Sequence, residues 1–346
     1  MKRYLVLTAL CLMALVSTAN GYRGEGGKYR YEAQMVIEQT YSVDANPILE
    51  MTGKYSDFII TPWDQQQIDF KVKIIVKSND EDKLRAKFNS IDVQFEQFGN
   101  KVTAETVFGD YKYRTFNGTM IIKYYVKVPR DVFMELDTKY GDIKVETVAK
   151  KFEVNIKYGD LKADSLLAEN SIDIKYGDIN INYAKNIELE LDYGDAKIQN
   201  CDNLRGELKY SNIYITELNE GRIENKYSTV RIEKVAKIDL DDSAYSDLKL
   251  SNVTNSMVID MRYCDLKATF STLKPIVDID GQYSDVVLYI KEDASFDYNL
   301  KSSYSDIIFR GFFDTKVIKG AGSYGEGERG RLYITTVYGD VKINKE

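Results

Sequence analysis

Histidine is absent from this sequence of 346 residues. Its absence removes the Ser-His-Asp and Cys-His arrangements of nucleophilic catalysis, together with the commonest zinc ligand. Cysteine is nearly absent too: Cys11 lies in an N-terminal apolar run, and only Cys201 and Cys264 follow it. Because the repeat described below separates these two by several coils, we expect two free thiols and no disulfide framework.

Long apolar runs are missing after the N-terminus. The one such run, Leu5 to Val16, follows Lys2 and Arg3 and precedes small residues, which is the layout of a secretory signal peptide. It is too short to cross a bilayer core of about 30 Å as a helix. We expect residues 1–21 to be a signal peptide and the rest to be exported, without a transmembrane segment, to the periplasm, the cell surface or the medium.

The sequence also lacks an excess of basic residues. Without Lys2 and Arg3 it has 45 Lys and Arg against 54 Asp and Glu, a net charge of −9 spread along the chain. Nucleic acids are bound through basic patches that neutralise phosphates, so we expect no nucleic-acid partner.

Tyrosine, by contrast, is abundant, with 27 residues, and much of it belongs to one repeated motif. The motif is Tyr, a small residue, and Asp or a polar relative, followed by alternating apolar residues. Its copies are Tyr140-Gly141-Asp142, Tyr158-Gly159-Asp160, Tyr176-Gly177-Asp178, Tyr193-Gly194-Asp195, Tyr210-Ser211-Asn212, Tyr227-Ser228-Thr229, Tyr245-Ser246-Asp247, Tyr263-Cys264-Asp265, Tyr283-Ser284-Asp285, Tyr304-Ser305-Asp306 and Tyr338-Gly339-Asp340.

Successive tyrosines from Tyr140 to Tyr304 are 17 to 21 residues apart, and the step from Tyr304 to Tyr338 is 34, twice 17. Apolar residues alternate before and after each motif, as in β-strands. The tyrosine shares the parity of the apolar residues before it, which predicts that it points into the core. The small residue and Asp then form a bend between two strands.

A unit of 17 to 18 residues with two short strands cannot bury its own apolar face, so it must stack on its neighbours. The sequence therefore predicts an all-β fold, a single-chain parallel β-solenoid. We expect an irregular cap over residues 22–135, with a strand at Ile68–Val76 and a short helix at Asp80–Ser90, and regular repeats over residues 136–346. The Gly-rich run from Gly320 to Gly330 is expected to be a loop, and Tyr338 to Ile343 the last coil.

Earlier segments carry the same theme: Tyr55-Ser56-Asp57 is one motif copy and Phe108-Gly109-Asp110 a degraded one. With Trp63-Asp64, the segment Tyr124 to Pro129, the repeats and the closing Thr336 to Ile343, the chain resembles the bacterial adhesin-like family of β-solenoid domains, which is related to auto-transporter adhesin heads and common in Bacteroidetes. The resemblance implies a right-handed β-helix-like fold and an envelope or extracellular setting. It transfers no catalytic residue.

The recurring aspartates admit two interpretations. Carboxylates stacked about 4.8 Å apart repel one another, and calcium at Asp142, Asp160, Asp178 and Asp195 would compensate. Alternatively, each carboxylate accepts hydrogen bonds from N–H groups of its own bend, and Asn212 and Thr229, which lack the charge, favour this interpretation.

These observations favour a non-enzymatic, adhesin-like exported protein that binds a glycan, an envelope polymer or another protein, without a cofactor or catalytic residue. The alternatives are a structural or stress-associated envelope protein with no diffusible ligand and, third, a carbohydrate-active β-helix enzyme. The regular middle coils lack the long loops that wall an enzymatic cleft.

Overall fold

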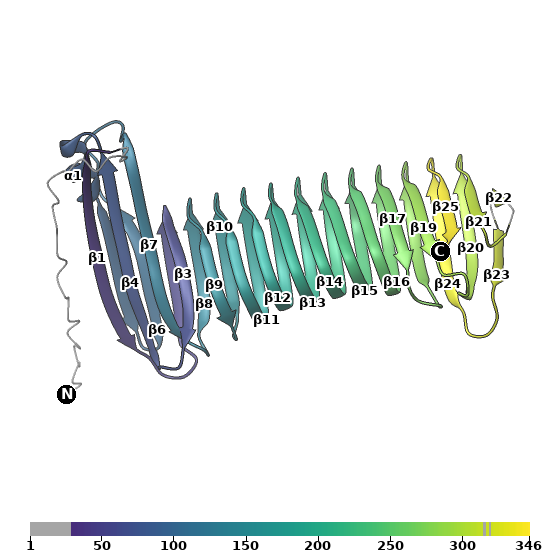
Figure 1. The fold of residues 1–346 in the computed structure, drawn as a ribbon, viewed down its shortest axis with the longest axis horizontal. Coiled ribbons are helices and arrows are strands. Elements are labelled where there is room, and N and C mark those ends of the chain that lie inside the picture. Colours follow the sequence, from purple (N-terminus) through teal and green to yellow (C-terminus); the bar gives the residue numbers. More distant parts are fainter. Residues whose placement is uncertain (1–28, 314–315, 318–319) are drawn as a thin grey trace. The chain divides into compact units, whose positions relative to one another are not determined.

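The computed structural model describes residues 29–313, 316–317 and 320–346, so the expected signal peptide and Cys11 lie outside the described residues. The fold is nearly all-β (Figure 1). In the described ranges no helix is long and apolar enough to span a membrane. The chain divides into two compact units, the first ending at Ala163 and the second running from Asp164 to Glu346. We describe each by itself.

From residue 29 onward, unit 1 contains ten strands and a helix: β1 (Tyr31–Ser42), β2 (Ile48–Lys54), β3 (Ser56–Trp63), β4 (Gln67–Ser78), α1 (Glu81–Phe88), β5 (Ile91–Phe98), β6 (Lys101–Phe108), β7 (Gly118–Pro129), β8 (Phe133–Lys139), β9 (Ile143–Val148) and β10 (Phe152–Lys157). One wall has the order β1-β4-β7-β3-β9, and the other has the order β5-β6-β2-β8-β10. The pairs β1–β4, β4–β7 and β5–β6 are antiparallel, and the other pairs of these two walls are parallel.

The irregular cap and its helix are confirmed. The expected strand at Ile68–Val76 lies within β4. Helix α1 begins after Asp80, whose carboxylate accepts a hydrogen bond from the Lys83 N–H at 3.1 Å, the usual N-cap arrangement. Leu84 is its buried residue.

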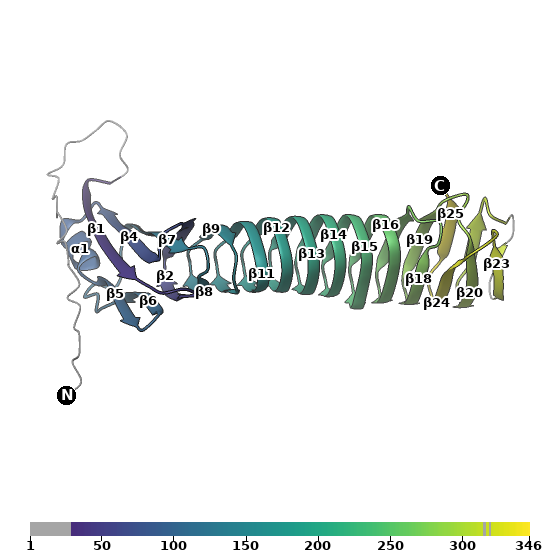
Figure 2. The same ribbon diagram turned by 90° about the horizontal axis from the view of Figure 1, so that it is seen from below.

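Strand β11 (Leu161–Lys175) crosses the boundary between the units. Unit 2 continues with β12 (Ile179–Asp192), β13 (Asp195–Lys209), β14 (Asn212–Lys226), β15 (Thr229–Ala244), β16 (Asp247–Arg262), β17 (Asp265–Phe270), β18 (Ile276–Gln282), β19 (Asp285–Ile290), β20 (Phe296–Ser303), β21 (Ile307–Arg310), β22 (Lys316–Val317), β23 (Gly320–Tyr324), β24 (Gly330–Val337) and β25 (Val341–Lys345). Within this unit, successive ribbons wrap as coils around a common core (Figure 2).

Parallel register confirms the β-solenoid. Ile179 pairs with Ala196, Ala196 with Ile213, and Ile213 with Val230, a constant step of 17 residues. Each strand from β12 to β16 forms most of one coil. Its first half, directly after one Tyr motif, belongs to one wall of the solenoid, and its second half, directly before the next motif, belongs to the opposite wall. Apolar residues of both walls are buried between them, because alternate side chains of a strand point to the same face.

The coil of Tyr338 to Ile343 is last in sequence but not at the end of the stack. Strand β24 lies between β18 and β20 (Figure 2), and β25 lies between β19 and β21 (Figure 1). The outermost coil is therefore that of β20 and β21. Its outer edge is covered by antiparallel β23 and β22, which leaves fewer unpaired backbone groups. Part of the expected Gly320–Gly330 loop is thus strand β23, a correction to the sequence interpretation.

Candidate functional site: the tyrosine ladder

Every motif tyrosine adopts a left-handed backbone conformation. Their φ angles lie between 53° and 62°, a region that L-residues other than glycine seldom occupy. This turn of the backbone interrupts the strand alternation, so the side chain emerges on the outside. The prediction that these tyrosines point into the core is therefore wrong: apart from Tyr304, each is 40–52% exposed.

The tyrosine rings stack on one another along each unit. In unit 1, Tyr55, Tyr140 and Tyr158 follow at centroid distances of 5.0 Å, and Phe108 packs edge-on against Tyr55 at 6.0 Å. In unit 2 the centroid distances are 4.8–5.0 Å and the interplanar angles 3–10°, in the order Tyr176, Tyr193, Tyr210, Tyr227, Tyr245, Tyr263, Tyr283, Tyr338, Tyr304. We call this row in each unit the tyrosine ladder. Phe108, from the degraded copy of the motif, therefore lies at the Tyr55 end of the row in unit 1.

Stacking offsets the cost of the backbone conformation. A left-handed L-residue costs about 1–2 kcal/mol, whereas each aromatic pair contributes about 0.5–1.5 kcal/mol beyond burial, and an interior ladder tyrosine has two such neighbours. The bend also keeps its backbone hydrogen bonds: the Tyr193 N–H donates to the Lys209 carbonyl and the Tyr245 N–H to the Arg262 carbonyl, both at 3.1 Å.

The small residue after each tyrosine is the one that points inward. Ser211, Ser246 and Ser284 are 1–5% exposed. At glycine bends there is no room for a side chain: a Cβ on Gly194 would lie 2.0 Å from the Gly177 carbonyl oxygen, and one on Gly159 2.0 Å from that of Gly141. Glycine serves close approach between coils here rather than positive φ.

Serine bends use the hydroxyl to join coils. The Ser228 Oγ donates to the Lys226 carbonyl at 2.8 Å and accepts from the Ser211 N–H at 3.3 Å. The Ser246 Oγ likewise accepts from the Ser228 N–H at 3.2 Å. The N–H of Asp247 donates to the carbonyl of Ser228 at 3.1 Å. Each coil is thus hydrogen-bonded to the next within the bend itself.

At other bends the acceptor is an aspartate carboxylate of the neighbouring coil. The Asp160 N–H donates to Asp142 Oδ1, the Asp195 N–H to Asp178 Oδ1 and the Asp340 N–H to Asp285 Oδ1, each at 2.9 Å. These carboxylates accept from the neighbouring coil and not from their own bend, which corrects the sequence interpretation. An N–H donated to a charged acceptor contributes about 1.5–3 kcal/mol, and its dipole compensates part of the repulsion along the row.

The calcium hypothesis for Asp142, Asp160, Asp178 and Asp195 finds no matching donor set. Among the residues that the structure describes, no three or more acidic, histidine or cysteine side chains are grouped to hold a metal ion.

A groove follows the ladder of unit 2 over four coils. Its volume is about 630 Å³, and it is lined by Tyr227, Ser228, Thr229, Tyr245, Ser246, Asp247, Tyr263, Cys264, Asp265 and Tyr283. Phenol rings alternate along it with the polar side chains of Thr229, Asp247 and Asp265 at the spacing of the coils. It offers hydrogen-bond donors, acceptors and negative charge to a ligand that extends along several coils.

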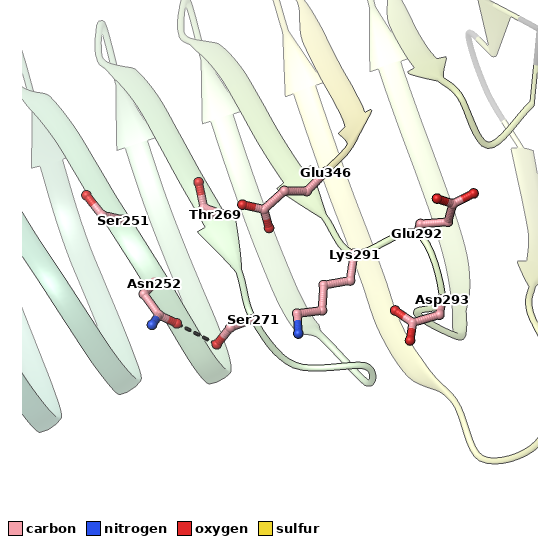
Figure 3. A pocket seen from close by; sticks show the side chains of 8 residues that line it. All are labelled: Ser251, Asn252, Thr269, Ser271, Lys291, Glu292, Asp293 and Glu346. Atoms are coloured by element: carbon pink, nitrogen blue, oxygen red, sulfur yellow. Dashed lines mark hydrogen bonds between the residues drawn. The ribbon is translucent and has the colours of Figure 1, made fainter.

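A second pocket lies where the coils become irregular (Figure 3). It is lined by Ser251, Asn252, Thr269, Ser271, Lys291, Glu292, Asp293 and Glu346. Ser271 Oγ donates to Asn252 Oδ1 at 2.5 Å, and Glu292 forms an ion pair with Lys345 at 2.5 Å. Uncharged polar groups lie on one side and Lys291, Glu292 and Asp293 on the other (Figure 3).

The two cysteines are free and buried, as predicted. Burial raises the pKa of the Cys201 thiol to about 12, which suppresses the reactive thiolate at neutral pH. Cys264 occupies the small-residue position of a bend, and its Sγ donates to the Arg262 carbonyl at 3.3 Å. Burial raises its pKa as well.

Residues 184–344 match the family model described as Toastrack DUF4097. This part of the chain is similar to the Toastrack domain. The matched residues lie wholly within unit 2, and the β-solenoid architecture there agrees with the fold that the resemblance noted in the sequence implies. No curated protein matches the chain.

Solved structures resemble the chain only weakly. A "putative adhesin" of Parabacteroides distasonis is 9% identical, with a TM-score of 0.40, and the match covers 90% of this chain and 97% of that one. A "putative lipid binding protein" of the same species is 10% identical, with a TM-score of 0.37 and coverage of 90% and 96%. A "putative adhesin" of Bacteroides fragilis is 11% identical, with a TM-score of 0.26 and coverage of 90% and 97%. No site is transferred from them to this chain.

Proposed function

We propose that this chain is an exported, non-enzymatic, adhesin-like protein that binds an extended glycan, envelope polymer or protein along its tyrosine ladder. The observation that carries the proposal is the groove of unit 2, in which exposed tyrosines and polar bend residues recur at the spacing of the coils. A polymer that lies along the coils meets the same groups several times, so weak contacts add up.

The stacking decides which contacts are available. The ladder rings that line the groove are covered on both faces by tyrosines 4.9 Å away, so a sugar ring cannot lie flat on them. The hydroxyls, the ring edges and the carboxylates of Asp247 and Asp265 remain. Recognition therefore proceeds through hydrogen bonds to hydroxyl, amide or cationic groups of the partner. Tyr304 ends the row of unit 2, stacks on Tyr338 and is 81% exposed, so its ring is the most accessible of the described motif tyrosines.

The test is binding of residues 22–346 to an array of glycans and envelope polymers, with and without calcium. The informative variant carries Tyr227→Phe, Tyr245→Phe and Tyr263→Phe, because phenylalanine keeps the stacking and removes the hydroxyls. Tyr333→Phe is the matched control, since Tyr333 is 44% exposed and lies outside the ladder. We expect saturable binding that weakens at least tenfold in the triple variant and is unchanged in the control. Binding that survives the triple variant would place the site elsewhere.

A structural envelope role is the second candidate function. The hydrogen bonds between neighbouring bends favour this role. They join the bends of Ser211, Ser228 and Ser246 and stabilise the stack without any ligand. Absence of binding to every polymer of the array, with and without calcium, would support this role and contradict the binding proposal. Hydrolysis of an arrayed glycan would instead support the carbohydrate-active alternative.

A further inference from the structure

The tyrosine ladder places phenols in an arrangement suited to oxidative coupling. From Tyr193 to Tyr283, successive rings are nearly parallel and separated by 4.9–5.0 Å. Each ring is about half exposed, so an external oxidant can reach it. We infer that the ladder is a site of covalent modification, at which one-electron oxidation joins tyrosines of adjacent coils as dityrosine.

The chemistry needs an oxidant, for which we name a heme peroxidase with hydrogen peroxide. Two neighbouring phenols each lose one electron and one proton to give two phenoxyl radicals, and the peroxide is reduced to two molecules of water. A carbon–carbon bond forms between ring carbons ortho to the two oxygens. The hydrogen on each coupled carbon then moves to the adjacent oxygen and restores both phenols. The net change is loss of two hydrogen atoms from the protein and formation of one bond.

Proximity directs this coupling to the ladder. Each ladder phenol has a second phenol held beside it, which converts an encounter of two molecules into a reaction within one molecule. Tyr333 is as exposed as the ladder residues but lies over the guanidinium of Arg331. The product would link consecutive coils covalently, and the inference does not depend on the proposed polymer binding.

The experiment oxidises the folded protein with peroxidase and hydrogen peroxide at low protein concentration, then maps dityrosine in tryptic peptides. Tyr227, Tyr245 and Tyr263 fall in different tryptic peptides, so each junction is assigned separately. We expect peptides linked as Tyr227 to Tyr245 and Tyr245 to Tyr263. In the Tyr227→Phe, Tyr263→Phe variant, every cross-link of Tyr245 should disappear while the stack remains. The Tyr289→Phe, Tyr333→Phe variant should retain them, because Tyr289, in β19, and Tyr333, in β24, lie outside the ladder.

Two results would overturn the inference. One is dityrosine that forms chiefly between molecules or at tyrosines outside the ladder. The other is an equal yield of Tyr227–Tyr245 linkage from the folded protein and from protein unfolded in urea, since only the folded chain holds the rings together. Circular dichroism of each variant before oxidation establishes that the fold is intact.

Discussion

The contact between glycine bends predicts a large effect of one methyl group. Gly194→Ala would place a Cβ 2.0 Å from the Gly177 carbonyl oxygen and 3.0 Å from its carbon. Real carbon atoms approach neighbours to about 3.5 Å, so the two coils must separate by roughly an ångström or more. Both coils belong to unit 2.

The magnitude follows from what that shift disturbs. Inserting a methyl group into a packed site costs about 1–3 kcal/mol. The same shift weakens the hydrogen bond from the Asp195 N–H to Asp178 Oδ1, 2.9 Å long, which is worth about 1.5–3 kcal/mol. We expect Gly194→Ala to lower the free energy of unfolding by about 2–5 kcal/mol.

Gly206→Ala is the matched control, because Gly206 lies within β13, the strand that follows the Gly194 bend. Its added Cβ would meet only Ile223 side-chain atoms at 3.7 Å, an ordinary contact. Alanine there reduces the entropy of the unfolded chain, so we expect unchanged or higher stability, by up to about 1 kcal/mol. Urea unfolding followed by far-ultraviolet circular dichroism measures both variants. Equal midpoints for Gly194→Ala and Gly206→Ala would refute the reasoning.

Three further predictions concern other residues. Tyr245→Ala should be less stable in urea than Tyr245→Gly, by about 1 kcal/mol. Both variants lose the ring stacking, but only alanine retains the steric strain of a left-handed backbone at φ 53°. The reverse order of stability would contradict this argument. Cys201 should react with a thiol reagent at pH 8 only as fast as the protein opens, because burial raises its pKa to about 12, and denaturant should make it react at once. Burial, with repulsion from Asp241, raises the pKa of Asp239 although Arg222 opposes the shift. The folded state therefore binds this proton more tightly than the unfolded state, so Asp239→Asn should raise the urea midpoint at pH 7, and this gain should vanish below about pH 4; a gain independent of pH would point to another cause.

Local chemistry made much of the fold predictable from the sequence. The recurrence of the Tyr motif at 17 to 18 residues and the alternation around it depend on strand geometry within one coil. They predicted the parallel β-solenoid, and the pattern around Asp80 predicted the short helix of the cap. The sequence singled out the motif tyrosines as a structural repeat but gave them the wrong orientation, since parity assumes an unbroken strand and each motif tyrosine leaves the strand at positive φ.

Contacts between coils were decided by the tertiary structure alone. A repeat motif has the same sequence wherever its coil lies in the stack. The sequence therefore did not reveal that β24 and β25 are inserted between the coil of β18 and β19 and the outermost coil of β20 and β21. Nor did it reveal that glycine is required at position 194 because the carbonyl of Gly177 lies where a Cβ would be. It also did not reveal that the Ser228 hydroxyl accepts a hydrogen bond from the backbone N–H of Ser211. The sequence by itself determined the coil and its period, because these arise from bonds and side-chain alternation along the chain. The order of the coils and the outward tyrosine ladder arise from how one coil meets the next, and only the folded chain contains that contact.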